Sequence, residues 1–168
     1  MSAATVNTTA NTSVFDQQKA EGFAERVCQM LDSGAVLAMI SVGHRSGLID
    51  AMASLPPATS EAIAATADLA ERCVREWLAV MVTGHIIEYE PVSRTYRLPA
   101  EHAACLTSGA PLGNLAVYAQ HVTLIGQIQD QVLECFNSGK GMAYAYYPHF
   151  HEIMAEDSGQ TVGRSSST

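Results

Sequence analysis

The hydrophobic pattern between residues 59 and 98 constrains the fold more than any other feature of the sequence. Thr59 is a favourable N-cap for a short helix over Ser60–Ala67. After a turn at Asp68 and Leu69, apolar residues recur with helical spacing across a longer segment, Glu71–Thr83: Val74, Trp77, Leu78, Met81 and Val82. Gly84 follows, so we expect two helices joined by a tight turn and ended by this glycine.

Beyond Gly84 the apolar residues follow the period of a β-strand. Ile87 and Tyr89 alternate with glutamates, and Tyr96 and Leu98 alternate with Thr95 and Arg97. Residues 91–94 supply the turn between the two segments. Two helices followed by a hairpin form a winged helix-turn-helix. We therefore predict a mainly α-helical fold that contains a winged helix-turn-helix, a two-stranded wing and additional long helices.

The segments on both sides of this unit are also predicted to be helical. A first helix from Lys19 carries an apolar face of Phe23, Val27, Met30 and Leu31. We expect an interruption at residues 32–34, a second helix over Ala35–Arg45, and closure by a left-handed Gly47. After the wing, we expect a short helix through Leu106, a long helix over about 112–136 that is apolar on two faces, and a last helix over 148–157.

These segments divide the chain into one predicted domain and two tails. Residues 1–17 are small and polar and are expected to be disordered. Residues 18–157 are predicted to form the folded domain. Residues 158–168 read as a linker remnant followed by a polar tail.

The composition indicates a soluble protein with a partner. Apolar residues make up 48% of the chain and charged residues 15%, which is richer in apolar groups than an isolated soluble domain needs. No secretory signal is present, and the longest apolar run, Ala35–Ile40, is far below the roughly 20 residues of a membrane span. We expect a cytoplasmic protein that does not bind membranes, with its four cysteines reduced and mostly packed.

The charge disfavours nucleic acid as that partner. The chain has a net charge of −8, and residues 59–98 carry six acidic and four basic side chains. A DNA-binding unit should be basic. The exposed face of the second helix offers Arg72, Arg75 and Glu76, but then Ala79 and Thr83, which are poorly suited to reading base edges. DNA binding stays open as the alternative to packing and dimerisation.

Few residues suggest chemistry. No glycine pair follows a buried strand, as a nucleotide-binding loop requires. His149, His151 and Glu152 lack a further ligand and point apart at a helix start, so we predict no metal site. We assign no catalytic and no cofactor-binding residues. Polar tips on apolar segments suit a mixed pocket, which makes four side chains candidates for facing a substrate: Tyr118, His121, Tyr146 and His149.

An ordered series of motifs resembles one family of enzyme domains. The segments that carry the resemblance are Gly43–Met52, Leu55–Ser60, Val74–Leu78, Tyr96–His102 and Tyr147–Ser158. Together they are similar to the N-terminal winged-helix domain of bacterial S-adenosylmethionine-dependent methyltransferases that act on small molecules. The resemblance covers residues 22–162.

The resemblance implies a role without catalysis in this chain. In such enzymes the N-terminal domain forms a homodimer and covers the substrate pocket, while a following Rossmann-like domain binds S-adenosylmethionine. Because Gly163–Thr168 is a polar tail unlike the family's pattern, we expect a truncated methyltransferase that holds no cofactor and transfers no methyl group alone. A DNA-binding regulator and a dimerisation module that modulates an intact methyltransferase are the alternatives.

Overall fold

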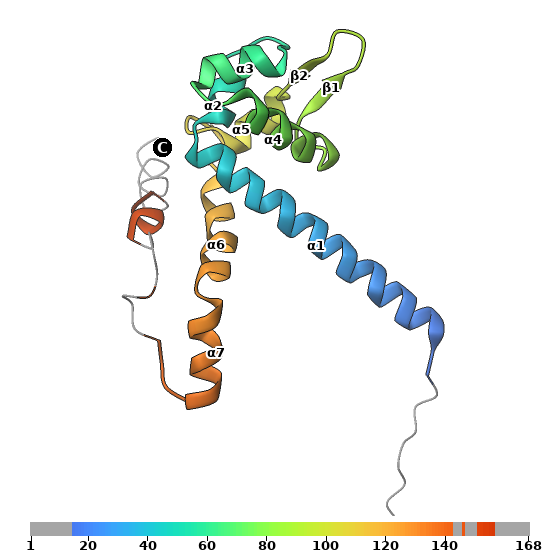
Figure 1. The fold of residues 1–168 in the computed structure, drawn as a ribbon, viewed down its shortest axis with the longest axis vertical. Helices are drawn as coiled ribbons and strands as arrows, with labels where there is room; N and C mark the ends of the chain where they lie inside the picture. Colours follow the sequence, from blue (N-terminus) through green and yellow to red (C-terminus); the bar gives the residue numbers. More distant parts are fainter. Residues whose placement is uncertain (1–14, 143–145, 147–150, 157–168) are drawn as a thin grey trace, which may run out of the picture. The chain divides into compact units, whose positions relative to one another are not determined.

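The computed structural model describes residues 15–142, 146 and 151–156, and it is mainly helical, as predicted. The chain divides into two compact units, residues 1–31 and 32–168. The elements follow in the order α1 (Gln17–Arg45), α2 (Leu48–Ala53), α3 (Ser60–Ala67), α4 (Glu71–Thr83), β1 (Glu88–Glu90), β2 (Thr95–Arg97), α5 (Ala100–Leu106), α6 (Ala116–Gln127) and α7 (Gln129–Ser138) (Figure 1). Residues 151–156 are also helical.

Helices α3 and α4 form the predicted helix-turn-helix. The Thr59 hydroxyl accepts a hydrogen bond from the backbone N–H of Ala62 at 3.4 Å, which caps the start of α3. Asp68 ends α3 in the left-handed conformation, with φ of 55°, and so turns the chain toward α4. Ala70 occupies the N-cap of α4 and makes no side-chain hydrogen bond there. The start of α4 therefore lacks a side-chain cap.

The wing is the antiparallel hairpin of β1 and β2. Its register pairs Glu88 with Arg97, Tyr89 with Tyr96 and Glu90 with Thr95. The rings of Tyr89 and Tyr96 lie 4.7 Å apart between centroids, as expected for a cross-strand pair on one face. Tyr96 also exchanges two backbone hydrogen bonds with Ala58, at 2.8 and 3.1 Å. These bonds tie the wing to the segment that leads into α3.

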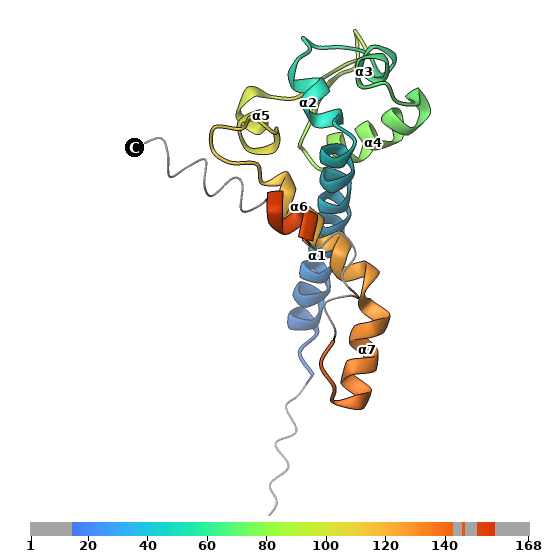
Figure 2. The same cartoon turned by 90° about the vertical axis from the view of Figure 1, so that its left-hand side faces the viewer.

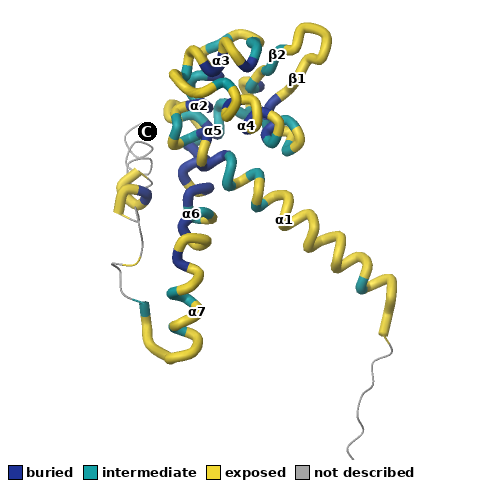
Figure 3. The backbone as a smooth tube through the Cα atoms, viewed as in Figure 1, coloured by how far each residue is buried: buried dark blue, intermediate teal, exposed yellow. Residues whose placement is uncertain are grey.

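The core of the second unit forms around α4. Its buried stripe, Val74, Trp77, Leu78 and Met81, is the one that the helical spacing predicted, and it packs with buried residues of α1, α2 and α3 (Figure 3). Trp77 donates a hydrogen bond from Nε1 to the carbonyl oxygen of Met39 at 2.8 Å. A Cβ atom at Gly43 would lie 2.5 Å from Cζ2 of Trp77. Only glycine therefore allows α1 to pass this close to the indole.

Two predicted helix boundaries are wrong. Helix α1 continues through Asp32, Ser33 and Gly34, where we expected an interruption. Each of these residues costs at most about 1 kcal/mol in a helix interior, too little to break a helix that is continuous on both sides. The long helix over 112–136 is instead two helices, which begin at Ala116 and break at Ile128, where φ is −103° and ψ is 9°.

Burial explains where that break falls. Ile128 is only 5% exposed, and Gly126, two residues before it, weakens the helix by about 1 kcal/mol relative to alanine. The local turn keeps the Ile128 side chain in the protein interior while α7 continues beyond it. Of the predicted tails, 1–17 and 158–168, residues 1–14 and 158–168 lie outside the described residues, as do Pro148 and Asp157 at the ends of the predicted last helix. Gln17, which we expected in the disordered tail, is the first residue of α1.

Two further expectations differ from the structure. Cys28 and Cys73 are exposed, so the expectation of packed thiols is wrong for them; Cys105 and Cys135 are partly buried. By length and composition, α1 could also cross a membrane: its most apolar window has a mean hydropathy of 1.2, and 17% of that window is buried. The sequence did not indicate this possible span, because its longest uninterrupted apolar run is short. A helix that packs against another protein chain can have the same length and mean hydropathy.

Candidate functional site

The first unit contains an apolar helix face that packs against no other described residue of that unit. Over residues 15–31, every residue but Ala20 is exposed. The predicted face is present and large, since Phe23 is 66% exposed, Met30 56% and Leu31 68%. We call Phe23, Val27, Met30 and Leu31 the α1 face. A helix of this kind has no core of its own, so its folding favours contact with another surface.

A second exposed apolar surface runs along α6 and α7. It consists of Leu115, Tyr118, Val122, Ile125, Leu133 and Phe136, which we call the α6–α7 face. The opposite side of α6 carries the buried residues Val117, Ala119 and Leu124. The prediction that this segment is apolar on two faces is thus confirmed, but the chain itself covers only one of them. Phe136, at 84% exposed, is the extreme case.

Two of the four sequence-predicted substrate residues lie on this exposed side. Tyr118 is 48% exposed, and its ring is stacked near that of His121, with centroids 6.2 Å apart and planes inclined by 19°. Tyr146 is 55% exposed. His149 lies outside the described residues. The structure therefore brings Tyr118 and His121 together on one helix, and their role toward a substrate stays a prediction.

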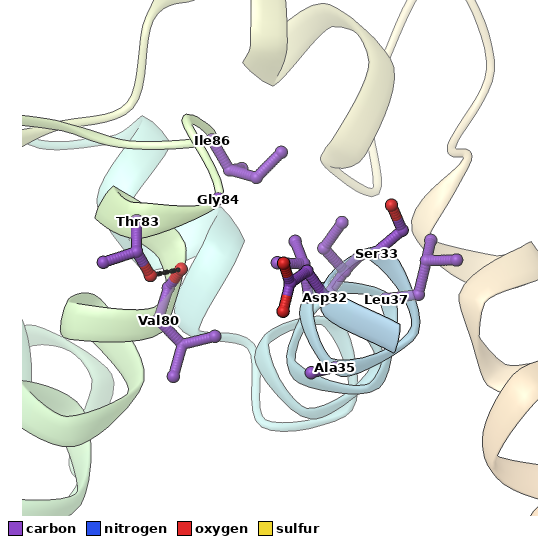
Figure 4. Close-up of a pocket in the computed structure, with 10 residues that line it drawn as sticks. Asp32, Ser33, Ala35, Leu37, Val80, Thr83, Gly84 and Ile86 are labelled. Carbon is purple, nitrogen blue, oxygen red and sulfur yellow. Dashed lines mark hydrogen bonds between the residues drawn. The ribbon is translucent and has the colours of Figure 1, made fainter. Parts of the chain in front are cut away.

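An apolar groove lies between α1 and the C-terminal end of α4 (Figure 4). Its volume is about 670 Å³, and its apolar lining includes Val36, Ile40, Val80 and Ile86. Asp32 adds a carboxylate to the lining. A Cβ atom at Gly84 would lie 2.7 Å from Val36, so glycine allows the end of α4 to approach α1. The groove is apolar enough to receive side chains from another surface.

A second hollow lies between the C-terminal end of α1 and α6. Its volume is about 490 Å³, and five of its six lining residues have polar side chains: Ser41, Val42, Arg45, Ser46, Thr123 and Gln127. A smaller recess of about 30 Å³ shares Arg45, Thr123 and Gln127 and reaches Glu152 and Ile153. Sequence reasoning missed this site. The spacing of four between Ser41 and Arg45, and between Thr123 and Gln127, could have placed each pair on one helix face.

Within the second unit, side-chain hydrogen bonds of Glu156 connect the helix over residues 151–156 to α1 and α6. Figure 2 shows this short helix beside α6. One oxygen of Glu156 lies 2.7 Å from Nε2 of His44, and the other accepts a hydrogen bond from Nε2 of Gln120 at 3.0 Å. Asn114 lies 3.4 Å from Nδ1 of His44 and also accepts a bond from the backbone of Ala116. Because its oxygen is used in this way, Asn114 donates to Nδ1, and His44 donates from Nε2 to Glu156.

Two of the four arginines of the winged helix-turn-helix are paired with glutamates of the same unit. Arg75 lies 3.4 Å from Glu71, and Arg97 donates from Nε to Glu88 at 3.0 Å across the hairpin. Hydrogen bonds from its own backbone, and then from the Thr59 hydroxyl, lower the pKa of Glu61 at the start of α3. Arg75 and Arg97, which a DNA-binding protein could direct to phosphates, therefore contact glutamates within the unit.

This arrangement of helices and hairpin matches a known domain. Residues 34–108 match the Rv2258c-like winged HTH domain. The match begins within α1, includes the whole helix-turn-helix and wing, and ends just after α5. No curated protein sequence matches the chain.

The fold of the chain, winged HTH domain included, is similar to those of several solved methyltransferases. Mitomycin 7-O-methyltransferase MmcR shares 16% identity with a TM-score of 0.63, over 87% of this chain and 46% of that one. CalO1, a methyltransferase in calicheamicin biosynthesis, shares 15% identity with a TM-score of 0.61, over 90% and 46%. Human N-acetylserotonin methyltransferase shares 17% identity with a TM-score of 0.58, over 77% and 37%.

This chain spans less than half the length of each of these three structures. The similarity is to the N-terminal region of methyltransferases that use S-adenosylmethionine. Because the sequence identity is low, this similarity establishes the fold alone. At the level of the fold it confirms the resemblance that the sequence motifs indicated.

Proposed function

We propose that this chain is the dimerisation and substrate-covering domain of an S-adenosylmethionine-dependent methyltransferase that acts on a small molecule. The observation that carries the proposal is the pair of exposed apolar faces on a fold shared with the N-terminal region of such enzymes. An isolated soluble domain rarely exposes contiguous apolar patches of this kind. The α1 face and the α6–α7 face are accounted for if each is covered in an assembly.

A second copy of the chain is the partner that fits best. Apolar faces without a strong charge of their own suit the large, hydrophobic interfaces of obligate homodimers. The α1 face lies on a helix of 29 residues, long enough to give an extended contact. The same pairing accounts for an apolar α1 that is little buried within one chain.

The described residues do not fit S-adenosylmethionine. The described part of the chain contains one sheet of two antiparallel strands. Adenine-nucleotide-like cofactors are held at the carboxyl ends of parallel strands, next to a glycine-rich turn that begins a helix. We therefore propose that the methyl donor is bound by a domain outside these residues, and that the helices described here contribute apolar and polar walls to the substrate site.

The first experiment measures the oligomeric state. Sedimentation velocity of the full chain should show a dimer, and Ile125→Asp, which places a charge on the α6–α7 face, should shift it toward monomer. Gln129→Asp is the matched control, because Gln129 is also exposed but lies outside that face. A monomeric wild-type chain, or equal dissociation of both variants, would contradict the proposal.

The second experiment addresses the cofactor. Isothermal titration of the chain with S-adenosylmethionine should give no binding heat. Saturable binding would show that the chain holds a cofactor site, contrary to the proposal. Co-purification with a full-length methyltransferase, in place of self-association, would favour a role as a modulator of that enzyme.

DNA binding is the alternative that the winged HTH domain raises. The ion pairs Arg75–Glu71 and Arg97–Glu88 and the net charge of −8 all oppose it. Titration with a random 30-base-pair duplex at low salt should show no saturable, salt-dependent binding. Binding that weakens steeply with salt would favour a regulator instead.

A further inference from the structure

We propose that the hollow lined by Ser41, Arg45, Thr123 and Gln127 binds a small molecule through a carboxylate group. We call it the Arg45 hollow; it lies between the C-terminal end of α1 and α6. This inference does not depend on the proposed function, because every residue that carries it belongs to the second unit of one chain. Three independent observations support it.

The first observation is the hydroxyl of Ser41. The residue is only 2% exposed, yet it lines the hollow. Among the described residues this hydroxyl has no hydrogen-bond partner, whereas Thr66, Thr83, Thr107 and Thr123 all donate to a backbone carbonyl of their own helix. Among the described side chains, the buried oxygen without a partner is Oε1 of Gln131, so the Ser41 oxygen opens onto the hollow and can take a hydrogen-bond partner there. A ligand in the hollow would supply it.

The second observation is the charge of Arg45. Its side chain lines both the hollow and the adjoining recess, and it forms no ion pair within the described part of the chain. The negative end of the α1 dipole favours a cation at this position. That interaction leaves the N–H donors of the guanidinium available. A planar fork of donors matches a carboxylate in two parallel hydrogen bonds.

The third observation is the opposite wall. Thr123 and Gln127 lie one turn apart on α6 and face the hollow together with Arg45. Thr123 donates its hydroxyl proton to the carbonyl of Gln120 at 2.8 Å, so its oxygen remains an acceptor. The Gln127 amide offers two donors and an acceptor. No acidic side chain is among the six that line the hollow itself.

Together these groups favour binding of an organic carboxylate. Arg45 and the Ser41 hydroxyl, four residues apart on α1, can both donate toward one carboxylate. Val42 supplies an apolar contact on the same wall. A volume of about 490 Å³ is within the range of small-molecule sites. A cation is disfavoured because Arg45 is the one charged residue of the lining.

The test is an NMR titration of the full chain with benzoate, followed through backbone amides and the side-chain amide of Gln127. Saturable shifts are expected for residues 41–46 and 123–127. Benzamide has the same shape without the charge, and its binding should be at least about tenfold weaker. Inorganic phosphate tests whether any anion suffices, and it should bind more weakly than benzoate.

Three variants assign the contacts. Arg45→Gln should weaken benzoate binding by about tenfold or more, because it removes the charge and the fork of donors. Ser41→Ala should weaken binding by roughly threefold to tenfold without lowering the melting temperature, since no hydrogen bond of the free protein is lost. Arg72→Gln is the matched control: Arg72 is an exposed arginine on α4 without an ion pair among the described residues, and its loss should leave binding unchanged.

Several results would overturn the proposal. Equal binding of benzamide and benzoate would show that the carboxylate is not recognised, and stronger binding of phosphate would assign the site to another anion. Shifts confined to residues outside the Arg45 hollow would show that benzoate binds elsewhere. The same conclusion would follow if Arg72→Gln weakened benzoate binding as much as Arg45→Gln. Sedimentation of the same samples separates a failure here from a failure of the proposed dimer.

Discussion

His44 and Glu156 are joined by a contact of 2.7 Å that connects the last turn of α1 to the helix over residues 151–156. The His44 side chain is 10% exposed, and its other ring nitrogen faces Asn114. Both ring nitrogens are therefore used within the protein, so His44 holds a segment in place and has no free nitrogen for a substrate. The carboxylate of Glu156 is held on both oxygens, since Gln120 donates to the second one.

Loss of this contact should release residues 151–156. We expect Glu156→Ala to raise amide hydrogen exchange in that segment about fivefold, equivalent to about 1 kcal/mol, because Glu156 is 42% exposed and solvent screens the pair. Hydrogen–deuterium exchange with mass spectrometry measures this directly. Glu156→Gln keeps one oxygen acceptor and should have a smaller effect. Unchanged exchange in both variants would mean that apolar packing of Ile153 alone holds the segment.

Two glycines of the same helix should respond in opposite ways to alanine. At Gly43, the new Cβ would overlap the Trp77 indole, and we expect Gly43→Ala to lower the free energy of unfolding by about 1–3 kcal/mol. At Gly22, no atom lies within 4 Å of the new Cβ, so Gly22→Ala should favour the helix by about 0.5–1 kcal/mol.

Denaturant unfolding followed by Trp77 fluorescence gives the first value, and circular dichroism of the helix gives the second. A neutral Gly43→Ala would show that α1 can move away from the indole at little cost. Loss of helix in Gly22→Ala would show that α1 does not extend through this position in solution.

A side-chain cap at the start of α4 should stabilise the fold. Ala70 occupies the N-cap without a side-chain hydrogen bond. Ala70→Asn should add about 1 kcal/mol and raise the melting temperature by roughly 2–4 °C, because its side chain can accept from a free N–H of the first turn. Ala79→Asn, at an exposed position within the same helix, is the control and should lower it. If both variants lowered it, the cap geometry would be unsuitable.

The wing should weaken at alkaline pH. Burial, and then the neighbouring Tyr89, raise the pKa of Tyr96 above its ordinary value of 10.0. An acid whose pKa is raised in the folded state contributes stability that is complete below pH 10 and is lost as the pH rises through the folded-state pKa.

The free energy of unfolding should therefore fall above pH 10, and Tyr96→Phe should remove part of that fall. The measurement is chemical denaturation at pH 8 and at pH 11 for both proteins. At pH 8 the tyrosine is neutral in both states, so this condition serves as the internal control. An identical pH dependence in the two proteins would contradict the assignment to Tyr96.

The local elements were predictable to within a residue or two where short-range chemistry decides them. Thr59 caps α3, the spacing of Val74, Trp77, Leu78 and Met81 sets the buried side of α4, and the change of period at Gly84 marks the wing. Helix interruptions were not predictable in this way. Asp32–Gly34 are poor helix formers that α1 includes, while Ile128 is at a break in a helical pattern because its burial outweighs local preference.

The candidate site was less accessible to sequence reasoning. Tyr118 and His121 could be placed together by their spacing on one helix, but no periodicity shows whether a chain will cover an apolar face. The Arg45 hollow was missed because its walls come from helices far apart in the chain. Their chemistry is visible only when Ser41 and Arg45 are seen opposite Thr123 and Gln127.

The amino-acid sequence by itself determined the winged helix-turn-helix, because caps, turns and hydrophobic periods act over a few residues. It also determined the acidic charge that opposes DNA, since net charge does not depend on the fold. Only the tertiary structure decided which apolar faces remain exposed and which polar groups lack partners. Both depend on contacts between distant helices, as in the pairing of His44 with Glu156.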